Sequence, residues 1–599
     1  MIDYVPPLRD MRFILSELAG LELIASLPGC EEAGEDVVAA ILEEAGRFAA
    51  GVLAPINRQG DIEGCRLNAD GRVETPSGWK AAYDQFRESG WIGLSAPVAF
   101  GGQGLPKLVS TPVWEMWFST NMAFTMLPQL NVSQAEALQI AASEDQKQTW
   151  LHKIVSGEWG ATMNLTEPQA GSDLAATRTR AEPQTDGSYR LFGQKIYISY
   201  GEHELTPNIV HLVLARLPDA PEGVKGLSLF IVPKYLLDAE GQPGEKNDLR
   251  CISIEHKMGI HGSPTCTMSY GDQGGAVGWL VGKPNRGLET MFIMMNEARF
   301  GVGLQGLGLA ERAYQYALSY ACERVQGRNA VSGEAGSPIV HHSDVKRMLM
   351  TMRARILAMR ALLYTAAGWF DIAHHHPDPV VAERHRRFVD VLMPVAKGWC
   401  TEVGNEVCDD ALQVFGGMGF VEETGIAQLF RDARIITIYE GTTGIQANDL
   451  VGRKILRENG ETLAELIKEI RATAAELQQD GKDAALPLIG NRLGDITDEL
   501  DRALNWVLAN GSERLGSVLG GAVPFLHLFG VVAGGWQLAR IAQAAVGKLS
   551  AGEGDSGYLQ SLIDIARFYM AYEGPQSVAY ADAMMNGGTE VDRFNVRML

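Results

Sequence analysis

The chain is organised around residues 435–444, which read Ile-Ile-Thr-Ile-Tyr-Glu-Gly-Thr-Thr-Gly. One carboxylate, Glu440, follows a run of large apolar side chains and precedes a loop of small ones. Burial among apolar side chains disfavours the charged form of a carboxylate and raises its pKa, which suits a general base for a weakly acidic C–H bond. The alternative is a helix that ends at Tyr439, with Glu440 in solvent and Gly441 and Gly444 acting as caps. Taken alone, the stretch favours this alternative.

Two further segments combine glycines with polar groups. Residues 165–173 read Leu-Thr-Glu-Pro-Gln-Ala-Gly-Ser-Asp, where the proline stiffens the chain and Gly171 allows close approach of the backbone to a ligand. Its hydroxyls suit the pyrimidine edge and phosphates of a flavin, although a decorated loop at a strand end fits the pattern equally well. Residues 414–419 read Val-Phe-Gly-Gly-Met-Gly. N–H groups exposed in such a turn can bind a diphosphate, whereas a plain helix cap predicts no ligand.

These three segments resemble the signatures of the flavin-dependent acyl-CoA dehydrogenases, in the order and at about the spacing of that family. The resemblance covers roughly residues 40–455, and the three motifs together are far more specific than any one. The length of 599 residues and the ending Gly-Ile-Gln-Ala-Asn-Asp-Leu at 444–450 resemble the long subgroup that includes 3-methylmercaptopropionyl-CoA dehydrogenase. The resemblance therefore implies FAD as cofactor and an acyl-CoA thioester as substrate.

The pattern of apolar residues predicts an α+β chain that is mostly helical. Helices are expected over 8–25 and over 35–53, ending before Pro55, and a loop with a short hairpin over 60–78. Short β-branched and aromatic runs follow between 189 and 232, and long helical periodicities return after 287. The resulting domains are an N-terminal extension, an N-terminal helical domain, a middle β domain, a helical bundle with the catalytic Glu and an extra C-terminal helical domain, at 1–35, 36–160, 161–286, 287–457 and 458–599.

Composition narrows the classes of partner. The 73 acidic and 52 basic side chains leave a formal charge of −21, which makes nucleic acid a poor default partner and requires a local basic cluster for an anionic CoA ester. The seven scattered cysteines suit reduced thiols in a cytoplasmic protein, and no secretory signal is visible. Residues 520–538 lack formal charge but contain a proline and five glycines, which favours a buried helix pair or turn over stable membrane insertion.

The resemblance assigns the flavin contacts. Near the ring or its hydrogen-bonding edge it implies Met163, Leu165, Thr166, Tyr197 and Ser199, with Ser172 at the pyrophosphate or CoA and with Thr442 and Gly444 on the other side. Arg324, Gln413, Gly416 and Gly417 would reach the flavin diphosphate of a neighbouring subunit, so the chain is expected to form a homodimer or homotetramer. The strand Tyr197-Ile198-Ser199 places an aromatic ring and a hydroxyl on one face, although a cross-strand aromatic pair is the simpler interpretation of Tyr197 alone.

The substrate contacts implied by the resemblance are Ser172, Asn296, Arg299, Tyr439 and Gly441. Many relatives carry Asp at the position of Asn296, and a surface arginine is the default interpretation of Arg299. The run of three histidines at 374–376 resembles a metal cluster only superficially, because adjacent side chains at a helix end point in different directions, so no metal is expected.

The expected reaction is α,β-dehydrogenation of a saturated acyl-CoA to the trans-2-enoyl-CoA, as in β-oxidation of fatty acids. Glu440 removes the α proton, the β hydrogen leaves as hydride to flavin N5, and an electron-transferring flavoprotein reoxidises the flavin. The acyl group is 3-methylthiopropionyl or another short, medium or long chain. The alternatives are an acyl-CoA oxidase that uses O2, and a non-catalytic or DNA-binding protein on the same scaffold.

Overall fold

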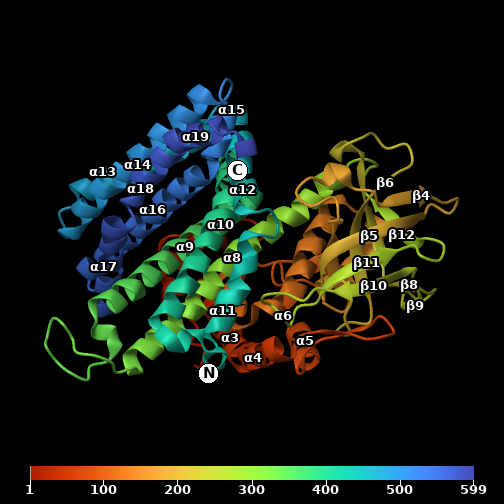
Figure 1. Ribbon diagram of the computed structural model, residues 1–599, viewed down its shortest axis with the longest axis horizontal. Helices are drawn as coiled ribbons and strands as arrows, with labels where there is room; N and C mark the ends of the chain where they lie inside the picture. The colour runs from red at the N-terminus through yellow and green to blue at the C-terminus, as the bar shows by residue number, and fades with distance from the viewer. Residues whose placement is uncertain (1, 599) are drawn as a thin grey trace. The chain divides into compact units, whose positions relative to one another are not determined.

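The computed structural model describes residues 2–598, which divide into two compact units. Unit 1 contains residues 2–46, 106–119 and 302–598, and unit 2 contains residues 47–105 and 120–301. The predicted α+β architecture with mostly helical content is confirmed. Figure 1 shows the helices and strands with the labels used below.

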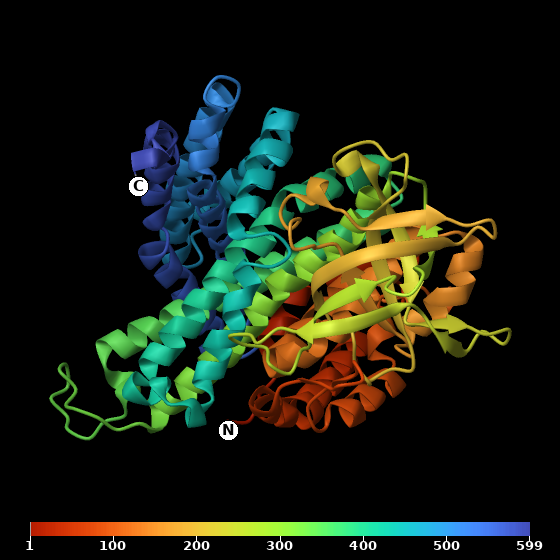
Figure 2. The same cartoon turned by 45° about the vertical axis from the view of Figure 1, so that its right-hand side comes forward.

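Unit 2 is built around an eight-stranded sheet with the strand order β10-β11-β5-β12-β7-β6-β3, and β4 pairs with both β5 and β6. Side chains of β6 alternate between two cores, because Val210, Leu212 and Leu214 face one side while Val213 and Ala215 face the other. Helical residues between Ala135 and Val155 cover the first side, as the orange segments beside the yellow sheet show in Figure 2. The strands are β3 (Gly160–Asn164), β4 (Arg180–Pro183), β5 (Tyr189–Ser199), β6 (Ile209–Arg216), β7 (Leu227–Pro233), β10 (Leu249–Ile254), β11 (Thr265–Tyr270) and β12 (Ala276–Val281), with small hairpins β1 (Arg66–Leu67)–β2 (Val73–Glu74) and β8 (Tyr235–Leu237)–β9 (Pro243–Lys246).

Unit 1 is helical. The bundle that holds the central motif comprises the unit 1 part of α8 (Gly287–Glu323), α9 (Ser343–His375), α10 (Pro379–Val414), α11 (Ile426–Ala433) and α12 (Thr443–Asp449). The C-terminal helices are α13 (Glu461–Gln479), α14 (Ala485–Asn510), α15 (Leu515–Gly520), α16 (Ala522–Ala551), α17 (Ser556–Tyr572), α18 (Gln576–Asp582) and α19 (Gly588–Arg593). Of these, α16 packs against both α9 and α10, so the C-terminal helices share one core with the bundle (Figure 1).

The remaining helices are α1 (Leu8–Glu17), α2 (Leu21–Ala25), α3 (Glu35–Phe48), α4 (Ala54–Glu63), α5 (Trp79–Glu88), α6 (Lys107–Ala141) and α7 (Glu144–Val155). The single helix predicted over 8–25 is wrong, because Gly20 adopts a left-handed conformation with φ +78° and separates α1 from α2. The predicted end before Pro55 is also wrong. A π-helical turn, Ala49–Leu53, leads into α4, where Pro55 lies in the first turn and its missing N–H costs no helical hydrogen bond.

Glycines bring α8 and α10 close together. A β carbon on Gly303 would lie 2.5 Å from the Ala396 carbonyl oxygen, and one on Gly306 would lie 2.5 Å from the Cys400 carbonyl oxygen. Both distances are too short for a real contact with backbone atoms. The two helices therefore pack backbone to backbone only because these positions lack side chains.

Two helices of unit 1, Ser343–His375 and Ala522–Ala551, are long and apolar enough to cross a membrane, but 83% of the most apolar window of each is buried inside the protein. Residues 520–538 lie at the end of α15 and in α16, which agrees with the predicted buried helices and turn. All seven cysteines are free thiols.

Candidate active site

Glu440 lies in a short irregular segment between the 3₁₀ turn Arg434–Thr437 and α12. Its backbone is left-handed with φ +56°, and Gly441 follows with φ +93°. A left-handed conformation costs a residue other than glycine about 1–3 kcal/mol and persists only where surrounding contacts impose it. The helix end predicted as the alternative is absent at Tyr439, because the preceding helical turn stops at Thr437.

The environment of Glu440 is only partly apolar. Ile436 is fully buried, whereas Ile438 is 47% exposed and Glu440 itself is half-buried. Burial, followed by the charge of Glu440, raises the pKa of Tyr439.

Four side chains form hydrogen bonds that hold this segment, and sequence analysis assigned none of them this role. They are Gln305, Lys397, Glu402 and Gln446. The Tyr439 hydroxyl donates to Gln305 of α8, and the Lys397 Nζ of α10 donates to the Gly441 carbonyl oxygen at 2.6 Å. Gln446 of α12 donates from Nε2 to the Glu440 carbonyl oxygen at 3.1 Å, and the Thr443 hydroxyl donates to Glu402 of α10 at 2.5 Å. Three of these hydrogen bonds join residues 41–134 positions apart, and the fourth joins Glu440 to a residue six positions ahead in α12, so no local pattern marks the partners.

The predicted flavin residues of unit 2 meet where β5 passes the segment after β3. The Ile196 N–H donates to the Thr166 carbonyl oxygen at 2.9 Å, and the Lys195 Nζ donates to the Leu165 carbonyl oxygen at 3.0 Å. Leu165 and Thr166 are thereby brought next to the part of β5 that carries Tyr197. Met163 is half-buried on β3, whereas Ser172 is exposed.

A buried ion pair fixes this junction. Lys195 Nζ and Glu167 Oε1 lie 2.8 Å apart, with side chains 0% and 3% exposed. The Glu167 carboxylate also accepts hydrogen bonds from the Arg178 and Thr179 backbone N–H groups and from the Thr179 hydroxyl. Burial alone would raise the pKa of Glu167, but Lys195 and these donors lower it below its ordinary value. The acid inside the second motif is therefore structural.

Tyr197 sits on a β-bulge. The pairing of β5 with β11 changes register between Cys266 and Met268, and Tyr197 takes a left-handed φ of +60°. Its side chain is 61% exposed, Ser199 is half-buried, and Ile198 between them is buried. Tyr197 makes no aromatic ring contact with any residue from 2 to 598, so it is not the cross-strand pair of the simpler interpretation.

Of the two predicted substrate residues in α8, Arg299 does not fit its default interpretation as a surface side chain. Arg299 is 7% exposed, so it is not a surface arginine, and it donates to the exposed Asn296 side chain at 3.4 Å. Burying a guanidinium is costly, which marks Arg299 as a positioned group.

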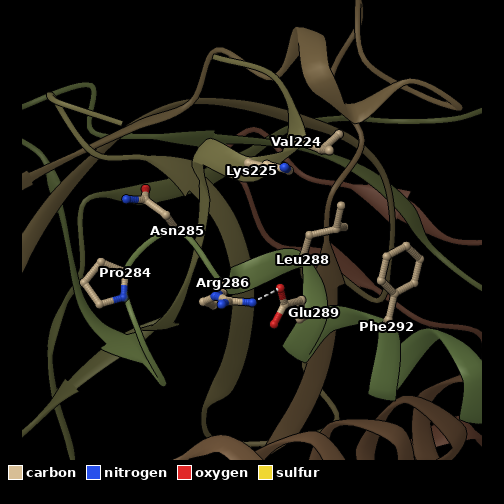
Figure 3. A pocket seen from close by; sticks show the side chains of 8 residues that line it. All are labelled: Val224, Lys225, Pro284, Asn285, Arg286, Leu288, Glu289 and Phe292. Carbon is tan, nitrogen blue, oxygen red and sulfur yellow. Dashed lines mark hydrogen bonds and ion pairs between the residues drawn. The ribbon is translucent and has the colours of Figure 1, made fainter. Parts of the chain in front are cut away.

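A cavity of ≈ 450 Å³ lies at the start of α8 within unit 2 (Figure 3). Two cations, Lys225 and Arg286, and one acid, Glu289, line it together with the apolar Val224, Leu288 and Phe292. Arg286 pairs with Glu289 at 2.5 Å. The N-terminus of a helix attracts anions, so this pocket combines apolar walls with a favourable site for negative charge. Sequence analysis missed it because Lys225 and Arg286 are 61 positions apart.

The residues predicted to bind the flavin diphosphate lie at the end of α8 in unit 1. The Tyr320 and Phe415 rings stack at 4.1 Å, which brings the end of α8, followed by Arg324, to the turn at Gly416 and Gly417. Arg324, Gln413 and both glycines are exposed. From Gln305 to Glu323 the helix rises by about 27 Å. This group is therefore remote from the Glu440 segment of the same chain.

Thr442 accepts a hydrogen bond from the Ile445 N–H and caps α12, and Gly444 lies in the first turn of that helix. No group of three or more metal-ligating side chains occurs among residues 2–598, and His374 and His375 hydrogen-bond to backbone carbonyls. The histidine run thus ends a helix without forming a metal cluster in the described part of the chain.

Comparison with known proteins now identifies the family. Models of the acyl-CoA dehydrogenase N-terminal, middle and C-terminal domains match residues 36–158, 162–272 and 285–456, and an acetyl-CoA dehydrogenase C-terminal-like model matches residues 466–593. The chain is 48% identical to the 3-methylmercaptopropionyl-CoA dehydrogenase of Ruegeria pomeroyi, covering 95% of each chain. It is 35% identical to the broad-specificity linear acyl-CoA dehydrogenase of Mycobacterium tuberculosis, again over 95% of each.

Solved structures share the fold. The acyl-CoA dehydrogenase of Bacillus anthracis complexed with FAD superimposes with a TM-score of 0.75 at 20% identity, covering 98% of this chain and 93% of that one. Because the match extends across the motifs and both units, the chain belongs to the acyl-CoA dehydrogenase family of oxidoreductases.

Proposed function

We propose that this protein oxidises a saturated acyl-CoA thioester to the trans-2-enoyl-CoA, with FAD as its cofactor and Glu440 as its base. The observation that carries the proposal is the left-handed, side-chain-clamped backbone at Glu440, since a strained non-glycine residue persists where function requires its position. FAD, when bound, supplies the acceptor for the β hydride.

The residues present fit a flavin. Tyr197 offers a largely exposed aromatic ring on a left-handed bulge, and Ser199 offers a hydroxyl two residues further along the same strand. Thr166 reaches the same part of unit 2 through its contact with Ile196, and Met163 precedes it by three residues on β3. We assign the contacts with the flavin ring to Met163, Leu165, Thr166, Tyr197, Ser199, Thr442 and Gly444.

Glu440 acts on the substrate. Its carboxylate takes the α proton, and its backbone N–H donates to the thioester carbonyl, which makes that proton more acidic. Tyr439 and Gly441 flank the reacting carbons, while Asn296 and Arg299 contact the CoA arm. Gln305 and Gln446 keep the segment in place during proton transfer.

The cavity at the start of α8 suits the nucleotide end of CoA. Lys225 and Arg286 supply the local positive charge that a chain with a formal charge of −21 needs for a polyphosphate ligand. Leu288 and Phe292 provide apolar area for the adenine or the pantetheine arm. Ser172 is assigned to the phosphates at the exposed turn of the second motif.

Association of two or four copies completes the cofactor site. The roughly 27 Å between Gln305 and the end of α8 exceeds the reach of one flavin, so Arg324, Gln413, Gly416 and Gly417 serve the FAD of a neighbouring subunit. Phe420 is 91% exposed beside that turn, and Met418 is 47% exposed. Exposed apolar residues next to a ligand-binding turn suit a subunit interface.

The acyl group we favour is 3-methylthiopropionyl, or a straight chain of short to long length, because the two relatives described above act on 3-methylmercaptopropionyl-CoA and linear acyl-CoAs by their names. An electron-transferring flavoprotein receives the electrons. The free thiols suit a cytoplasmic protein.

The test is flavin reduction by a panel of acyl-CoAs in wild type, in Glu440→Gln and in Glu423→Gln as a control at an exposed glutamate. Wild type and the control should bleach, whereas the Glu440 variant should remain yellow with its cofactor bound. Normal bleaching of Glu440→Gln would remove Glu440 as the base. Stoichiometric peroxide during turnover in air would instead favour an oxidase, and a protein that carries no flavin would refute the dehydrogenase itself.

A further inference from the structure

Lys397 is a buried lysine in the middle of α10. Its side chain is 0% exposed, and its Nζ lies 2.6 Å from the Gly441 carbonyl oxygen. Lysine is among the residues least often fully buried, because removing its amino group from water is costly unless partners compensate. A lysine kept at such a position in a helical core therefore needs specific partners, and one of them here is the residue after Glu440.

Helix packing leaves Lys397 little freedom. Its neighbour Ala396 contacts the backbone of α8 at Gly303, where a β carbon would come within 2.5 Å of the Ala396 carbonyl oxygen. On the other side of α10, a β carbon on Gly398 would lie 2.7 Å from Leu526 of α16. Since α10 is confined from both sides and the Lys397 side chain is fully buried, its amino group has little room to leave the Gly441 carbonyl oxygen.

The peptide that Lys397 holds follows two successive left-handed residues, Glu440 and Gly441. Gln446 holds the carbonyl oxygen of the preceding residue, Glu440, at 3.1 Å. Two adjacent carbonyl groups are thus fixed by donors from two different helices. Rotation about the Glu440 backbone would break at least one of these hydrogen bonds, so the pair determines where the Glu440 side chain points.

We propose that Lys397 is a positioning residue for dehydrogenation, acting through the Gly441 carbonyl to hold the carboxylate of Glu440 in its reactive direction. The inference rests on the proposed role of Glu440 as base. It adds that the direction of this carboxylate is imposed from α10 and is not an intrinsic property of the motif around Glu440. Gln446 acts with Lys397 on the neighbouring carbonyl.

The test compares Lys397→Met, which removes the donor, with Lys397→Gln, which retains an N–H donor. Lys454→Met is the matched control, because Lys454 is also largely buried but pairs with Asp390 rather than with the Glu440 segment. Measured quantities are the rate constant of flavin reduction at saturating acyl-CoA, the Kd of an unreactive acyl-CoA analogue, and hydrogen exchange of the amides at 439–446.

Lys397→Met should reduce flavin roughly 10- to 100-fold more slowly, because a misplaced reacting group costs about this much. Its analogue Kd should stay within twofold of wild type, its amides at 439–446 should exchange faster, and Lys397→Gln should recover part of the rate. Wild-type rate and exchange in Lys397→Met would overturn the inference, as would an equal loss of rate and of analogue affinity.

If Lys397→Met does not fold, Lys397→Gln and Gln446→Leu decide, because each weakens one of the two carbonyl contacts. Unchanged rates in both would overturn the inference. Failure of the proposed function is recognised separately, since normal flavin reduction by Glu440→Gln removes the base itself, whatever the Lys397 variants do.

Discussion

Replacing Lys195 by Met should loosen the segment that carries Leu165 and Thr166. The side chains of Lys195 and Glu167 are 0% and 3% exposed, and breaking a fully buried pair from one side costs about 3–5 kcal/mol. The carboxylate left behind still accepts hydrogen bonds from Arg178 and Thr179. We therefore expect the lower value, about 3 kcal/mol, in the free energy of local opening, or on the order of 10²-fold faster hydrogen exchange.

The measurement is exchange of the Arg178, Thr179 and Ile196 amides, whose acceptors are Glu167 and Thr166. It should be made at pH 7, because burial, opposed by Glu167, lowers the pKa of Lys195 to about 8 and the amine is still mostly charged below that pH. Weaker retention of FAD should accompany the faster exchange.

Two further variants isolate the cause. The double variant with Lys195→Met and Glu167→Gln should recover most of the loss, because no uncompensated charge remains. Arg250→Met breaks a pair with side chains 61% and 38% exposed, and it should cost less than about 1 kcal/mol. Exchange in Lys195→Met within threefold of wild type would refute the structural role assigned to this ion pair.

Three other changes have defined outcomes. Burial, followed by the charge of Lys234, lowers the pKa of His211 to about 3, so the stabilisation from its neutral form is complete above the ordinary pKa near 6.5 and is lost on acidification. In denaturant titrations, the loss of stability of unit 2 between pH 7 and 5 should therefore be smaller in His211→Gln than in wild type by about 2 kcal/mol. The hydrogen bond to Asp61 raises the pKa of His261 despite burial, so its contribution to stability is present below pH 6.5 and is lost as the pH rises through the folded pKa. Hydrogen-exchange protection at the end of α4, measured relative to the intrinsic exchange rate at each pH, should therefore fall from pH 6 to 8 in wild type but not in His261→Gln. Gly306→Ala should destabilise unit 1 by about 1–3 kcal/mol in thermal unfolding, because its β carbon would meet the Cys400 carbonyl oxygen at 2.5 Å, whereas Gly452→Ala, with no atom within 4 Å, should not.

Local order along the chain was predictable. Alternating β-branched residues place strands between Tyr189 and Val232, and long helical periods place α8 and α9, because side-chain direction repeats every 2 or 3.6 residues. The predicted helix boundaries were wrong at two places where the backbone conformation of a short stretch decides whether a helix ends. Gly20 divides the first helix, and a π turn carries the chain into α4 through Pro55.

The sequence by itself determined the family, the mostly helical α+β architecture and the position of the candidate base, because motifs such as the one around Glu440 are contiguous. Tertiary structure alone decided what holds that base. Lys397 and Gln305 approach it from helices far away in the chain, and Lys195 shows its role only through the loss of solvent around Glu167. Burial and distance depend on how the helices and strands pack. Packing brings together residues that are far apart along the chain, and no periodic pattern in the sequence marks such pairs.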